Sequence, residues 1–85
     1  MTQIGMKQMN ADKQQSFEHL EAAVTHLDSS VSAGSIATGA AKGFLYGLLE
    51  AVGTMVGDVD LPEHMRSGYE GLQETLREIR LKIGS

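Results

Sequence analysis

Two stretches of this 85-residue chain repeat apolar residues at alternating spacings of three and four, and this pattern constrains the fold most strongly. The spacing puts the apolar side chains in one narrow stripe along a helix, which suits packing along a nearly parallel or antiparallel neighbour. The stretches cover residues 10–31 and 60–83. The first stripe contains Phe17, Leu20, Val24, Leu27 and Val31, and the second contains Met65, Tyr69, Leu72, Leu76, Ile79 and Ile83.

The ends of these two helices carry recognisable signals. Asn10 is a suitable N-cap, and residues 1–9 are predicted to be a flexible tail because the stripe does not continue into them. In the later stretch, Asp60 offers a carboxylate N-cap, followed by an early proline and by Glu63. Gly84 is a plausible stop.

The middle stretch, residues 35–56, contains the segment GAAKGFLYG, in which Gly39, Gly43 and Gly47 recur every four residues. Each glycine inside a helix costs about 1 kcal/mol relative to alanine. Read in steps of four, three of the four rows of this helix are small or apolar, and only the row that contains Lys42 and Glu50 is polar. We therefore expect about three quarters of this helix to be covered, which makes it the central helix.

Short connections around residues 32–35 and 57–60 force consecutive helices to run antiparallel. The predicted fold is all-α: a three-helix up-down-up bundle within one domain, residues 10–85, with helices at about 10–31, 35–56 and 60–83. A chain of this size forms a thin core. We expect homo-oligomerisation to complete it.

The glycines admit two interpretations, because a row of them lets another helix backbone approach closely. The neighbour is either another helix of the same chain or a second copy of the protein. We favour the second copy, since the narrow stripes of the outer helices leave the broad middle helix incompletely shielded. The predicted interface consists of Gly39, Gly43, Gly47, Ala51, Phe44 and Leu48.

The polar row beside the glycines also has two interpretations. It is either a solvent-facing stripe or a groove that grips a partner or a small anionic ligand. The candidate groove residues are Lys42, Tyr46, Glu50, Arg66, Arg77 and Arg80.

Several function classes are disfavoured by composition. A net charge of −4 argues against binding to nucleic-acid backbone, and the chain has no cysteine for thiolate metal sites. The apolar middle is too short for a membrane span and is interrupted by Glu50. His19 and His26 are seven residues apart, whereas a metal pair on a helix favours a spacing of four. We predict no catalytic residues, metal or cofactor, and a cytoplasmic location.

The favoured function is a small non-enzymatic interaction module, an adaptor, assembly factor or inhibitor that acts as a homo-oligomer and binds another protein. One alternative is a protein that sequesters a small anionic or nucleotide signal at subunit interfaces. Others are a secretion chaperone or filament subunit, and a membrane-active protein.

Overall fold

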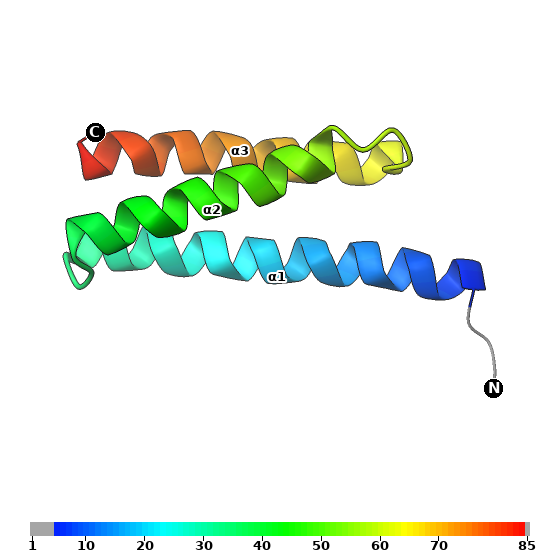
Figure 1. Ribbon diagram of the computed structural model, residues 1–85, viewed down its shortest axis with the longest axis horizontal. Helices are drawn as coiled ribbons and strands as arrows, with labels where there is room; N and C mark the ends of the chain where they lie inside the picture. Colours follow the sequence, from blue (N-terminus) through cyan, green and yellow to red (C-terminus); the bar gives the residue numbers. More distant parts are fainter. Residues whose placement is uncertain (1–4, 85) are drawn as a thin grey trace.

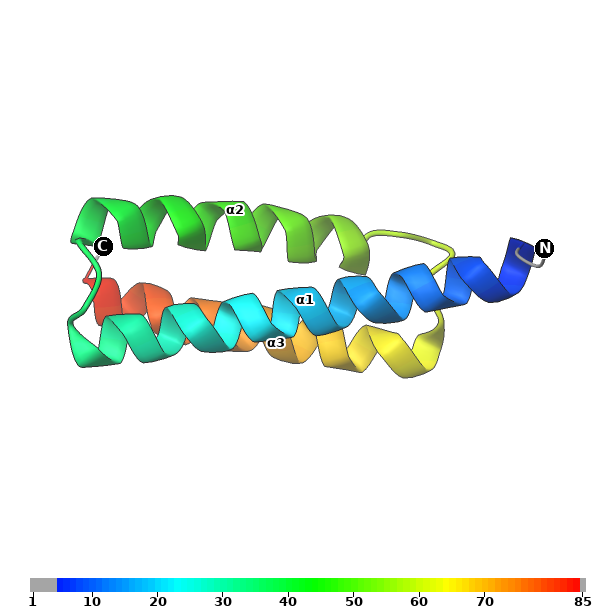
Figure 2. The same ribbon diagram turned by 90° about the horizontal axis from the view of Figure 1, so that it is seen from below.

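The computed structural model describes residues 5–84, with side chains described from residue 14 onward, and it is all-helical over this range. Helix α1 covers Gly5–Ala33, α2 covers Thr38–Val56 and α3 covers Glu63–Ile83. The helices run up, down and up, and α2 lies over the groove between α1 and α3 (Figures 1 and 2). The predicted antiparallel three-helix bundle is confirmed.

The first helix begins earlier than the sequence predicted. It starts at Gly5 and includes most of the segment that we expected to be a tail, whereas residues 1–4 lie outside the described part of the chain. Asn10 is therefore inside the helix and is not its N-cap. The apolar stripe was a poor guide here, because methionine, lysine and glutamine continue a helix well without forming a stripe.

The other two helices begin three residues later than predicted. Before α2, Gly34 adopts a positive φ of 68°, and the backbone N–H of Ser35 donates to the carbonyl of Ser30 at 3.0 Å, which closes the end of α1. Before α3, the backbone N–H of Asp60 donates to Oδ1 of Asp58 at 2.9 Å, a turn formed by an aspartate side chain. Pro62 occupies the N-cap position of α3, so the predicted cap at Asp60 is wrong.

The two apolar stripes form the core as the sequence predicted. Val24 and Leu27 of α1 are buried, and the other members of that stripe pack against them. Helix α3 buries Tyr69, Leu72, Leu76 and Ile79. Leu61, in the turn between α2 and α3, adds a buried side chain that the helical pattern did not indicate.

Less of helix α2 is covered than the three quarters that the sequence predicted. Its buried residues are Ala41, Leu45 and Val52, which form one stripe, and Phe44 is 60% exposed. The physical reason is that two neighbours with narrow stripes cover only one side of a third helix. Beside this stripe, Leu48, Leu49, Met55 and Val56 are partly buried against the core, whereas Gly39, Gly43 and Gly47 face outward.

Gly68 of α3 lies directly against the Phe17 side chain of α1. A Cβ atom at this position would lie 2.9 Å from Cε1 of Phe17, which is shorter than a normal carbon contact. The ring of Phe17 in turn meets that of Tyr69 edge to face, with the ring centroids 5.1 Å apart and an angle of 84° between the planes. Tyr69 is fully buried, and its burial raises the pKa of the phenol.

We predict that Gly68→Ala destabilises the bundle relative to Gly71→Ala. Both positions are in α3, but a Cβ at Gly71 meets nothing within 4 Å. The control should therefore gain up to about 1 kcal/mol from better helix propensity, whereas Gly68→Ala must displace the Phe17 ring. Urea unfolding measures both free energies, and equal gains in the two variants would contradict the close contact.

Candidate functional site

The glycine row, Gly39, Gly43 and Gly47, lies on the outward face of α2. All three residues are exposed, and a Cβ atom at any of them would meet nothing within 4 Å. With 3.6 residues per turn, Gly43 points about 180° around the helix axis from the buried Val52. The interpretation in which another helix of the same chain covers the glycines is therefore wrong. A second copy as the neighbour stays a prediction.

Two aromatic side chains flank the glycine row. Phe44 is 60% exposed and Tyr46 is 50% exposed. Because each residue turns by about 100° around the helix, these two rings point to opposite flanks of the row. The outward face is thus a smooth strip of glycine between two exposed aromatic rings, a composition suited to contact with another protein surface.

The flank that contains Phe44 continues onto α1 through a hollow of about 150 Å³. Ile36, Phe44 and Leu48 line it from the α2 side, and Leu48 also packs against the core. From α1 the hollow is lined by Ala23, His26, Leu27 and Ser30. The heptad pattern did not predict this hollow, because Ala23, His26 and Ser30 lie outside the apolar stripe.

The opposite flank is polar. It consists of every fourth residue of α2, namely Thr38, Lys42, Tyr46, Glu50 and Thr54, which we call the polar row. Lys42 is half-buried, while Glu50 is exposed. The hydroxyl of Thr54 donates to the backbone carbonyl of Glu50 at 2.9 Å, so this threonine is satisfied within its own helix. Lys42 and Glu50 thus stand eight residues apart on one side of the glycine row.

Arg66, a predicted groove residue, serves the end of α2 instead. Its guanidinium donates to the backbone carbonyl of Val56, and Nη2 donates to that of Asp58 at 3.3 Å. These carbonyls lie at the helix C-terminus and just beyond it, where no intrahelical donor remains. Lys42 lies about 20 Å away along the helix axis. The candidate groove residues therefore do not form one site.

The other basic residues of α3 do not form one cluster either. Arg77 pairs with Glu74 at 2.8 Å, and Arg80 is exposed in the last turn. Nζ of Lys82 contacts Oδ1 of Asp28 at 2.6 Å and donates to the Ser32 hydroxyl at 3.0 Å, which links the end of α3 to α1. The sequence pattern missed this link because its partners are far apart along the chain.

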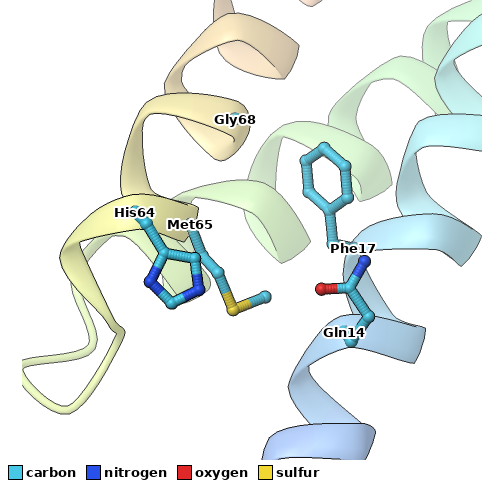
Figure 3. Close-up of a pocket in the computed structure, with 5 residues that line it drawn as sticks. All are labelled: Gln14, Phe17, His64, Met65 and Gly68. Carbon is cyan, nitrogen blue, oxygen red and sulfur yellow. The ribbon is translucent and has the colours of Figure 1, made fainter.

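A second hollow lies between α1 and the start of α3 (Figure 3). Gln14 and Phe17 come from α1, and Met65 extends from α3 towards them (Figure 3). Gln14 and His64 are exposed, so this hollow is a surface depression beside the contact of Phe17 with Gly68.

Within residues 5–84, no three side chains of the metal-binding types are grouped as a metal site. In the same range, no helix combines the length and the apolar character needed to cross a membrane. No protein-family model matches the chain, and no significant match was found among curated proteins or solved structures. The outward face of α2, with its open glycines and the exposed rings of Phe44 and Tyr46, is therefore the candidate interaction surface.

We predict that Arg66→Ala lowers the free energy of unfolding by about 1–2 kcal/mol, because two backbone carbonyls lose a charged donor. Arg77→Ala is the matched control on the same helix, since its exposed pair with Glu74 contributes less than about 1 kcal/mol. Thermal unfolding followed by circular dichroism tests both variants. Equal stabilities would refute the role assigned to Arg66.

Proposed function

We propose that this protein is a non-enzymatic interaction module that self-associates through the outward face of α2. The observation that supports this proposal is the glycine row, which stands in a helix and is open, since among the described residues nothing lies within 4 Å of a Cβ added there. Three helical glycines cost about 3 kcal/mol of helix propensity relative to alanine, a large share of the stability of a small domain. A second backbone packed against the row would offset this cost.

The flanks of the row support the same proposal. Phe44 and Tyr46 expose aromatic surface, and aromatic residues are enriched in the cores of protein interfaces. The hollow beside Phe44 extends the apolar surface onto α1. A module of this kind acts by presenting an assembled helical surface to another protein, as an adaptor, assembly factor or inhibitor does.

The proposal of a small anionic ligand has less support from the structure. It requires several basic side chains to converge on one point, whereas Arg66 donates to backbone carbonyls and Arg77 pairs with Glu74. Of the candidate basic residues, Lys42 alone lies beside the glycine row. A single half-buried lysine is a weak basis for selecting an anion.

Light scattering coupled to size-exclusion chromatography tests self-association. We expect the natural chain to show a multiple of its 9.1 kDa mass, and Gly43→Leu to show the monomer mass, because the new side chain keeps the second backbone away. Gly71→Leu is the matched control, since this exposed glycine of α3 is equally open but lies on a different helix. It should assemble like the natural chain.

A natural chain that is monomeric at high concentration would overturn the proposal. Equal assembly of the two leucine variants would also do so, because the glycine row would then lie outside any interface.

A further inference from the structure

We infer that the outward face of α2 binds a second copy of itself in antiparallel orientation, with the two-fold axis passing beside Tyr46. The inference deepens the proposed function and rests on it. Its basis is the arrangement of charge along the polar row, which is independent of the glycines.

The residues of the polar row are spaced symmetrically about Tyr46, and the charged residues on its two sides have opposite signs. Lys42 lies four residues before the tyrosine, and Glu50 lies four residues after it. The threonines Thr38 and Thr54 extend the same symmetry by another turn on each side. A two-fold axis through the centre of this row therefore sets each lysine against a glutamate, twice in one interface.

The flanks also favour this axis. A two-fold axis that lies between the copies, perpendicular to the helices, makes the two α2 helices antiparallel. It also places each flank of one copy opposite the same flank of the other. The polar row then meets the polar row of the second copy, and the flank of Phe44 meets the same apolar flank. The glycine rows face each other between them, where the absence of side chains permits close approach.

Parallel pairing gives a worse match. An axis along the helices places the polar row of each copy against the Phe44 flank of the other. Lys42 would then face apolar surface, and neither charge would meet its opposite. The cost of leaving charges beside apolar surface disfavours this orientation.

Charge reversal tests the inference. We expect Lys42→Glu to weaken the dimer about tenfold in Kd, because both lysine–glutamate contacts become contacts between like charges. Glu50→Lys should weaken it similarly. The double variant with both substitutions should recover the natural affinity to within about threefold, since the pairs are restored with their signs exchanged. Sedimentation equilibrium measures all four constants.

Cysteine cross-linking tests the orientation independently, in a chain without other cysteines. In the antiparallel pair, Gly39 of one copy lies within one residue of the level of Thr54 of the other, because they stand seven residues before and eight residues after Tyr46, while the two Gly39 positions are about 20 Å apart. We expect Gly39→Cys and Thr54→Cys, mixed and oxidised with oxidised glutathione, to form the mixed disulfide dimer. A tag on one variant separates this product from the homodimers by mass.

The outcomes separate the two claims. Homodimeric Gly39→Cys in place of the mixed product, or charge reversals that leave Kd unchanged, would overturn the antiparallel inference while self-association stands. A natural chain without any dimer would overturn the proposed function as well. Recovery in the double variant together with the mixed disulfide supports both.

Discussion

The structure depends on the contact between the apolar stripes of α1 and α3, which run parallel to each other. At one end of this contact the edge of Phe17 meets Tyr69, and Gly68 supplies the space that lets the ring sit there. At the other end, Lys82 links α3 to Asp28 on α1. Between these ends lie the buried side chains of Val24, Leu27, Leu72, Leu76 and Ile79, and each large apolar side chain contributes roughly 2 kcal/mol when removed from water.

Helix α2 is held by this pair from one side, and its outward face follows from that arrangement. Ala41, Leu45 and Val52 enter the groove between α1 and α3, while the guanidinium of Arg66 holds the far end of the helix. The rows that point away from this pair are the glycine row and the polar row, and they carry the exposed rings of Phe44 and Tyr46 on their flanks. An assembly that covered them would let a thin single-chain core share its burial with a second copy, which is a common solution for chains of this length.

The sequence predicted the parts of the fold that depend on periodicity. The stripes of α1 and α3 were identified residue by residue, because a strict alternation of three and four leaves one possible buried face. The orientation of α2 was not predictable in this way, since three of its four rows are apolar or small. Asp60 was misassigned as a cap because a capping residue is recognised only by its type. Arg66 was assigned to a ligand groove because nothing local indicates that its guanidinium reaches the carbonyl of Val56. Gly68 escaped notice because it lies beside the stripe, where only the fold brings Phe17 against it.

The central claim is that the outward face of α2 is completed by a second copy, and the concentration dependence of unfolding tests it most directly. If folding and self-association are coupled, the urea midpoint rises with protein concentration, by the equivalent of about 2.7 kcal/mol per dimer for a hundredfold increase. A midpoint that stays constant over that range would show that the single chain carries its full stability alone, and would contradict the account.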